Sequence, residues 1–167
     1  LTPNRIDAAS HIGVARDLAA YLAANGQSVE LTWPSVDEFS VDNHDLKIDV
    51  EVANAEEAPR YAGVTVTGCK IAPSPEWLQD SLRAVGINPK NNLVDITNYI
   101  LFELGQPLHA FDADKIEGGK IVVRTCEEGT PFVTLDGVER KLSAHDLMIC
   151  NAERPMCIAG VFGGLES

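Results

Sequence analysis

The sequence predicts an α+β fold, in which mixed or antiparallel sheets form a sandwich-like core with flanking helices and an additional N-terminal helix. Helical periodicity at 7–24, 74–86 and 94–104 predicts the helices. A run of short strand patterns across 120–162 predicts most of the sheet, and an alternating segment at 46–52 adds one strand between the helices. At 167 residues the chain is long enough to bury a sizeable core.

The first helix is predicted at residues 7–24. Asp7 or Ser10 can cap its N-terminus through a side-chain oxygen, and Asn25-Gly26 can end it in a left-handed turn. Apolar residues at helical spacing form a stripe, so we expect this helix to pack against another part of the protein. The stripe consists of Ile12, Ala15, Ala19 and Leu22.

A proline-containing acidic segment at 32–45 separates this helix from the remainder and is predicted to be a linker. The sequence therefore predicts that residues 1–31 are the C-terminal part of a preceding domain and that 46–167 form another domain. The chain begins with Leu1 rather than methionine and stops after an apolar run, which favours an excised piece of a longer protein.

The second domain is predicted to open with a half-buried strand at 46–52, because apolar and polar residues alternate there, and with a partner strand at 61–66. Ser74 is then a candidate N-cap, Pro75 suits the first helical position, and Gly86 ends the helix. The expected buried face of this helix is formed by Leu78, Leu82 and Val85.

The third helix is predicted at 94–104, where Gly105 provides the C-terminal stop and Pro107 prevents continuation. Asp136-Gly137 is a strong hairpin signal between two of the strands that follow. These strands are predicted at 120–126, 132–135, 138–142, 147–150 and 155–162.

The charge, the hydropathy and the cysteine spacing argue against three classes of protein: general nucleic-acid binders, membrane proteins and cysteine-based metal sites. The net charge of −12 argues against broad electrostatic capture of nucleic acid, although local contact with one end of an RNA stays possible. No apolar run is long enough to cross a bilayer, so no membrane is expected. The cysteines lack metal-site spacing and are expected to be buried, reduced thiols of a cytoplasmic protein, with no metal site. They are Cys69, Cys126, Cys150 and Cys157.

The segment 94–112 concentrates amide, hydroxyl, imidazole and carboxylate groups, which is typical of a site that binds a polar ligand. His109 follows a helix stop and Pro107, and Asp112 is near enough in sequence to orient its ring. One interpretation makes His109 a proton donor, a proton acceptor or a ligand for a substrate hydroxyl. The other makes it a histidine that bonds the carbonyl groups at the helix end, and the residues alone slightly favour this structural role.

Two further sets of residues allow two interpretations each. Thr97 and Asn98, expected in the first helical turn, suit either local hydrogen bonding or contact with a ligand. The glycines in 160–164 suit either a tight turn or a close approach of the backbone to a ligand, but the segment is not a phosphate loop. A carboxylate cluster of Glu103, Asp112 and Glu166 is another candidate, whereas no serine-nucleophile motif is present.

Several motifs together resemble the beta subunit of bacterial phenylalanyl-tRNA synthetase, over nearly the entire chain. The run from Leu104 to Asp112 is the most specific of them, and the passage Thr2–Arg5 with its following helix resembles the approach to the editing module of that family. The motifs are Arg60-Tyr-Ala62, Ser74-Pro-Glu-Trp-Leu78, Asn91-Asn92, Val94-Asp-Ile-Thr-Asn-Tyr99, Leu104-Gly-Gln-Pro-Leu-His-Ala-Phe-Asp112, Leu135-Asp-Gly137 and Ala159-Gly-Val-Phe-Gly-Gly164.

The resemblance implies that 46–167 belong to an editing domain that hydrolyses tyrosine wrongly attached to phenylalanine tRNA. It shifts the balance for His109 toward function. We predict that His109 and Asn98 position the ester, the terminal adenosine or the attacking water, without a covalent intermediate. Residues predicted to bind the substrate are Thr97, Gln106, Gly163 and Gly164, and Gly163 is expected to keep the cavity open.

The resemblance also sets expectations that reach beyond this chain. In the family the editing module continues past the position of Ser167, and the glutamate that recognises the tyrosine hydroxyl lies there, so Glu166 is not that residue. No cofactor is expected in this segment, whereas ATP and Mg²⁺ are implied for the full enzyme. The implied partners are the alpha subunit, in a heterotetramer of two alpha and two beta subunits, and the acceptor end of the tRNA. The alternative is a non-catalytic module that assists assembly and contacts tRNA.

Overall fold

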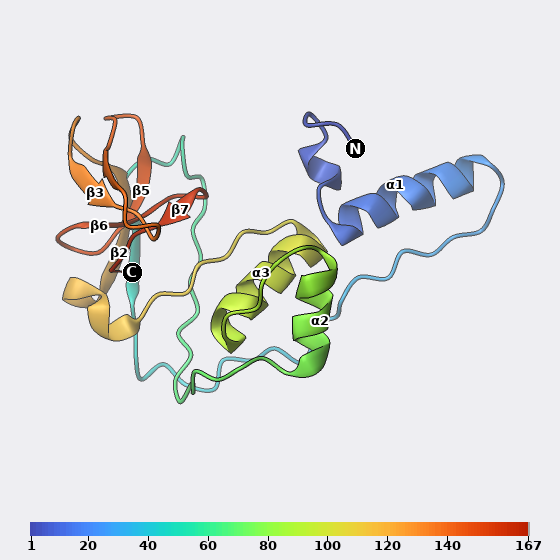
Figure 1. The fold of residues 1–167 in the computed structure, drawn as a ribbon, viewed down its shortest axis with the longest axis horizontal. Helices are drawn as coiled ribbons and strands as arrows, with labels where there is room; N and C mark the ends of the chain where they lie inside the picture. Colours follow the sequence, from blue (N-terminus) through green and yellow to red (C-terminus); the bar gives the residue numbers. More distant parts are fainter. Residues whose placement is uncertain (167) are drawn as a thin grey trace. The chain divides into compact units, whose positions relative to one another are not determined.

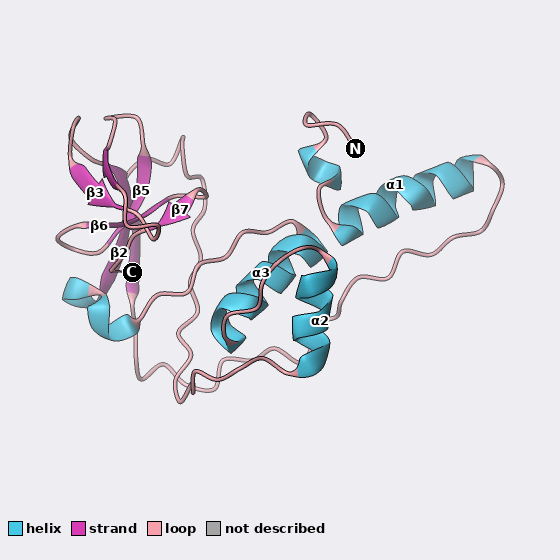
Figure 2. Cartoon of the chain, in the orientation of Figure 1, coloured by secondary structure: helices cyan, strands magenta, loops and turns pink. Residues whose placement is uncertain are grey.

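The computed structural model describes residues 1–166, and its helices and strands confirm the predicted α+β class (Figures 1 and 2). A mixed five-stranded sheet and a two-stranded sheet accompany three α-helices among the described residues. The helices are α1 His11–Ala24, α2 Glu76–Ala84 and α3 Asn92–Leu104, and the 3₁₀ turns are η1 Ile6–Ala8, η2 Ala113–Lys115 and η3 Glu117–Gly119. The strands are β1 Asp49–Val52, β2 Lys120–Thr125, β3 Pro131–Val133, β4 Glu139–Lys141, β5 Leu147–Cys150, β6 Pro155–Ile158 and β7 Phe162–Gly163.

Contacts between residues divide the chain into two units, each built from two separate segments. Residues 1–41 and 70–110 form the helical unit, and residues 42–69 together with the chain from 111 onward form the sheet unit. The predicted domain divisions after residues 31 and 45 stay a prediction, because this grouping describes contacts within the chain and not the domains of a longer protein.

Helix α1 begins at a sharp turn that only glycine fits. Ser10 is its N-cap, and the Ser10 hydroxyl accepts a hydrogen bond from the Gly13 backbone N–H at 3.1 Å. A Cβ at Gly13 would lie 2.5 Å from the Asp7 carbonyl oxygen and 2.6 Å from the Ala8 Cα. Of the two predicted caps, Ser10 is therefore the one in place, whereas the Asp7 carboxylate pairs with Arg5.

The predicted apolar stripe of α1 is half-buried, in agreement with a packed face. The helix contacts α3, where the His11 Nδ1 lies 3.1 Å from the Phe102 carbonyl oxygen. The opposite face remains exposed and carries Val14, Leu18 and Tyr21. Helix α1 thus belongs to the same contact unit as α2 and α3.

Helices α2 and α3 lie side by side and supply the buried centre of the helical unit (Figure 1). Leu78 and Leu82 are 2% and 1% exposed, which confirms two residues of the predicted face, while Val85 is half-buried. Trp77 and Tyr99 join the helices in an edge-to-face contact with ring centroids 5.6 Å apart.

The C-terminal end of α3 follows the predicted signal, whereas the helix begins two residues before the predicted start. The Asn91 side chain caps it by accepting from the N–H groups of Leu93 and Val94. Gly105 ends it with φ +77°, a backbone conformation that favours glycine. Because of the earlier start, Thr97 and Asn98 lie in the second helical turn and not in the first.

The N-cap predicted for α2 is wrong. Pro75 occupies the cap position, and Ser74 makes no cap bond. Its hydroxyl instead donates to the buried carboxylate of Asp95 at 2.5 Å. The side-chain orientation that brings the Ser74 hydroxyl to Asp95 makes no bond to the N–H groups at the start of α2.

The five-stranded sheet has the order β1-β2-β5-β6-β7, and β1 and β2 form its parallel pair. The remaining neighbours are antiparallel, as are β3 and β4, which the Asp136-Gly137 turn joins as predicted, with φ +76° at Gly137. Residues on opposite faces of β2 and β5 form two apolar clusters. One contains Ile121, Val123, Ile149, Met156 and Cys157, and the other contains Phe132, Leu142, Met148 and Cys150.

Two strand predictions are wrong in their details. Residues 61–66 pair with no described strand, and Val64 and Val66 are each 69% exposed. The alternation there resembles a strand, but a strand needs a ladder partner, and β1 pairs with the distant β2 instead. The single strand predicted at 155–162 is two strands, β6 and β7, because Gly160 turns the chain with φ +69°.

All four cysteines are free thiols, as predicted, but they are not all buried. Cys150 and Cys157 lie within the apolar clusters, and burial raises the pKa of the Cys157 thiol to about 11. Cys126 is half-buried and Cys69 is exposed, because residue 69 lies on a loop.

Candidate functional site

The predicted site residues of the helical unit lie on α3 and on the segment that leaves it. Thr97 is half-buried, and its hydroxyl donates to the Val94 carbonyl oxygen at 2.8 Å, which is the local bond expected for threonine inside a helix. Asn98 is also half-buried, but its amide forms no hydrogen bond with any residue of the described chain. The Asn98 amide can therefore offer both its donor and its acceptor to a ligand.

Gln106 and His109 lie on the extended segment after the Gly105 stop. The Gln106 amide nitrogen donates to the Pro107 carbonyl oxygen at 3.1 Å. His109 is exposed as a whole, but partial removal of water from its ring lowers its pKa below the ordinary value of 6.5, which favours the neutral imidazole at pH 7. A neutral imidazole has one nitrogen that accepts a proton and one that donates a hydrogen bond, as substrate positioning requires.

The lowered pKa of His109 predicts a measurable titration. We expect the ring protons of His109 to titrate in NMR with a midpoint below 6.5, and His109→Gln identifies the resonance by removing it. Since the unfolded chain takes up this proton first, the contribution of His109 to stability is complete above about pH 6.5 and declines as the pH falls below that value. A midpoint at or above 6.5 would contradict the desolvation of the ring.

The predicted glycines of the sheet unit, Gly163 and Gly164, are both buried. Gly163 belongs to β7, pairs with Cys157, and accepts from the Leu135 N–H at 3.0 Å. Gly164 donates from its backbone N–H to the Met156 carbonyl oxygen at 2.8 Å. These bonds tie the end of β7 to β6 on one side and to the β3 end of the hairpin on the other.

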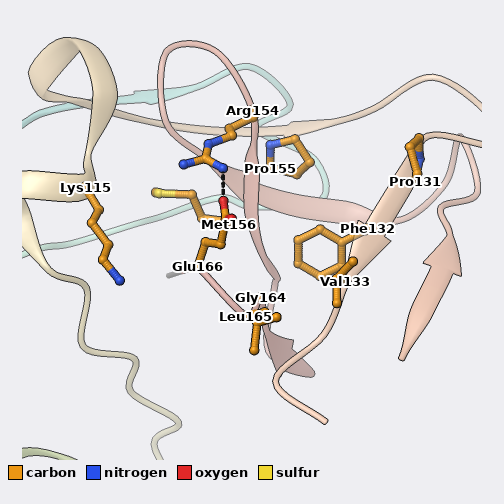
Figure 3. Close-up of a pocket in the computed structure, with 10 residues that line it drawn as sticks. All are labelled: Lys115, Pro131, Phe132, Val133, Arg154, Pro155, Met156, Gly164, Leu165 and Glu166. Atoms are coloured by element: carbon orange, nitrogen blue, oxygen red, sulfur yellow. Dashed lines mark hydrogen bonds and ion pairs between the residues drawn. The ribbon is translucent and has the colours of Figure 1, made fainter. Parts of the chain in front are cut away.

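A pocket of about 270 Å³ opens beside Gly164 in the sheet unit (Figure 3). Its wall is mainly apolar, and its charged groups are Lys115, Arg154 and Glu166. Arg154 forms ion pairs with Glu166 and, at 3.3 Å, with Glu117, so its charge is already compensated. The apolar lining residues are Pro131, Phe132, Val133, Pro155, Met156, Gly164 and Leu165.

Sequence reasoning named two residues of this pocket, Gly164 as a substrate-binding residue and Glu166 as part of a carboxylate cluster, and missed the others. Phe132 and Met156 come from strands far apart in the chain, and their alternation in the sequence indicates burial but not a shared cavity. Arg154 precedes a strand and matches no motif. Gly163 is not among the lining residues, so its predicted role in keeping a cavity open stays a prediction.

The structure gives the three carboxylates of the predicted cluster separate partners. The Glu103 carboxylate accepts from the Tyr99 hydroxyl at 3.4 Å, and Asp112 caps η2 by accepting from the Asp114 N–H at 3.1 Å. Glu166 pairs with Arg154. Across residues 1–166, no group of three or more His, Cys, Asp or Glu side chains is arranged to hold a metal ion.

The same chain matches a known family model over residues 57–167, described as the B3/4 domain. The chain belongs to the B3/4 domain family. This match includes every predicted site residue of both units, from Thr97 to Gly164.

The chain is similar to several proteins that share one name. It is 66% identical over 167 residues to the phenylalanine–tRNA ligase beta subunit of Bacteroides fragilis, 65% identical to that of Bacteroides thetaiotaomicron, and 50% identical to that of Geobacillus kaustophilus. Each match covers 100% of this chain and 20% of the relative, so the chain spans about a fifth of the length of these proteins. The resemblance drawn from the sequence motifs is thereby confirmed.

No helix among residues 1–166 is long and apolar enough to cross a membrane.

Proposed function

We propose that this chain is part of the beta subunit of a phenylalanine–tRNA ligase and contributes to the hydrolysis of tyrosine wrongly attached to phenylalanine tRNA. The observation that carries the proposal is the identity of 66% over the whole chain to beta subunits of that name, combined with the B3/4 match over 57–167. The ligase itself would be the complete protein, of which this chain corresponds to about a fifth.

The chemical need for such a step follows from the two amino acids. An apolar pocket built for phenylalanine cannot strongly reject an analogue that adds only a hydroxyl group. A second pocket with polar groups that bind the hydroxyl favours the tyrosyl product, because these groups lose their partner when phenylalanine enters.

In this proposal the polar residues of the helical unit hold the substrate. The Asn98 amide, which no described residue bonds, and the neutral His109 imidazole bind the ester, the terminal adenosine or the attacking water. Thr97 and Gln106 add substrate contacts. Gly163 and Gly164 of the sheet unit are also proposed to bind the substrate, and hydrolysis proceeds by direct attack of water.

The complete protein would supply what this chain lacks. An alpha subunit is the implied partner, in a heterotetramer of two alpha and two beta subunits, and the acceptor end of the tRNA is the substrate. ATP and Mg²⁺ would serve amino acid attachment, and the described residues include no carboxylate cluster that fits the ion. We propose that this reaction takes place in the cytoplasm.

A deacylation assay tests the proposal. The complete beta subunit with its alpha subunit is expected to release tyrosine from tyrosyl-tRNA(Phe), and Gly163→Trp is expected to stop the release while phenylalanine attachment continues. Gly63→Trp is the matched control, because nothing lies within 4 Å of a Cβ at this exposed loop position.

The outcome also separates the two functions that the sequence left open. Wild type and Gly163→Trp could both release tyrosine no faster than tyrosyl-tRNA(Phe) hydrolyses without protein. In that case the chain is a non-catalytic module that assists assembly or contacts tRNA. If both release it quickly and equally, the editing site lies elsewhere in the protein.

A further inference from the structure

We propose that Ser74 and Asp95 are positioning residues for the editing reaction, and that they act by fixing the place of the Asn98 side chain on α3. This inference rests on the proposed function and assigns to that site a pair of residues that do not contact substrate.

Asp95 is 1% exposed and Ser74 is 5% exposed. The Ser74 hydroxyl donates to Asp95 Oδ2 at 2.5 Å, and the Lys90 backbone N–H donates to Asp95 Oδ1 at 2.8 Å. No lysine, arginine or histidine of the described chain pairs with this carboxylate. Burying a carboxylate without a cation is costly, and only its hydrogen bonds offset that cost, so the arrangement tolerates little displacement.

The two donors come from segments on either side of α2. Asn92 strengthens the same attachment, because its side chain accepts from the Ala72 N–H at 3.3 Å and donates to the Lys70 carbonyl oxygen at 2.9 Å. The first two turns of α3 are therefore joined by side chains to the segment 70–74 and to residue 90. These bonds set both the rotation of α3 about its axis and its position along that axis.

Asn98 follows Asp95 by three residues, so the two side chains are neighbours on the same face of the helix. Asn98 is half-buried, and its amide has no hydrogen bond of its own within residues 1–166. Nothing polar in the described chain holds this amide, and its place follows the helix that carries it. A shift of α3 at Asp95 therefore moves the Asn98 amide by a similar amount.

A double-mutant cycle in the complete beta subunit with its alpha subunit tests this coupling. Ser74→Ala is expected to lower kcat for tyrosyl-tRNA(Phe) hydrolysis by about ten- to a hundredfold, with KM and the rate of phenylalanine attachment unchanged, because displacements near 1 Å cost up to about a hundredfold. In the Asn98→Ala background, Ser74→Ala is expected to lower kcat less than about twofold further, since the group it positions is gone.

Matched variants separate positioning from stability. Ser81→Ala, which removes an exposed serine of α2 that donates to the Trp77 carbonyl oxygen, is expected to leave hydrolysis unchanged. Asp95→Asn is expected to keep most of the activity that Asp95→Ala loses, because an amide can accept from the Lys90 N–H and donate to the Ser74 hydroxyl.

If Ser74→Ala lowered kcat by the same factor in the wild-type and the Asn98→Ala backgrounds, the inference would be overturned, while the editing function would remain in place. Loss of phenylalanine attachment in parallel with hydrolysis would also overturn it, since that result indicates general destabilisation. If Asn98→Ala alone left hydrolysis at the wild-type rate, the role proposed for Asn98 would fail, and the positioning role of Ser74 and Asp95 with it.

Discussion

His109→Ala is expected to lower the hydrolysis of tyrosyl-tRNA(Phe) by about a hundredfold or more, with phenylalanine attachment unchanged. A positioned histidine that transfers a proton or orders the attacking water contributes about 10²–10⁴-fold to such reactions. The lowered pKa of His109 keeps the imidazole neutral at pH 7, which is the form that can accept a proton from water. The measurement is the first-order rate of tyrosine release in the complete beta subunit with its alpha subunit.

The control for this variant is His145→Ala. His145 is an exposed histidine between β4 and β5, and it contributes only its backbone N–H, which donates to the Ser143 hydroxyl. Removing its ring is expected to change the rate less than about twofold, in keeping with the small effects of surface substitutions. Equal rates for His109→Ala and wild type would remove His109 from the mechanism and leave the histidine as a structural residue.

Local signals in the sequence predicted helix ends well because a cap depends on residues a few positions apart. Ser10, Asn25 and Gly105 end their helices as their side chains or backbone freedom require. Ser74 carried the same signal and was misjudged, since its hydroxyl bonds Asp95, which lies 21 residues along the chain. This contact comes from tertiary structure, and no residue near Ser74 in the sequence predicts it.

Strand pairing depends on distant segments, and the sequence predicted it less well. Residues 61–66 have the alternation of a strand, yet β1 forms its parallel ladder with β2. The candidate site divides in the same way. Polar residues within one helix and its exit, such as Asn98 and His109, could be found from local pattern and motif. The pocket beside Gly164 could not, because it is lined by Phe132 and Met156 from different strands.

Gly164→Ala is expected to destabilise the chain by about 1–3 kcal/mol, the usual cost of adding a methyl group to a packed interior. A Cβ at Gly164 would lie 2.6 Å from the Met156 carbonyl oxygen and 2.9 Å from the Phe132 Cζ. The carbonyl cannot simply retreat, because it accepts the hydrogen bond from the Gly164 N–H that holds β6 against the end of β7. The Phe132 ring is 6% exposed and packs with Leu142 and Met148, so it has little room to turn.

Urea unfolding of the chain, compared with Gly63→Ala, measures this cost. A Cβ at Gly63 meets nothing within 4 Å, so the control is expected to unfold at the wild-type midpoint or slightly above it, because alanine restricts the unfolded chain. Gly164→Ala is expected to unfold at a clearly lower urea concentration with the same slope. Coinciding midpoints for the two variants would show that β6 and the Phe132 ring yield to a methyl group at little cost. In that case the pocket would accommodate a methyl group at position 164, and only a larger side chain there would be expected to alter the cavity.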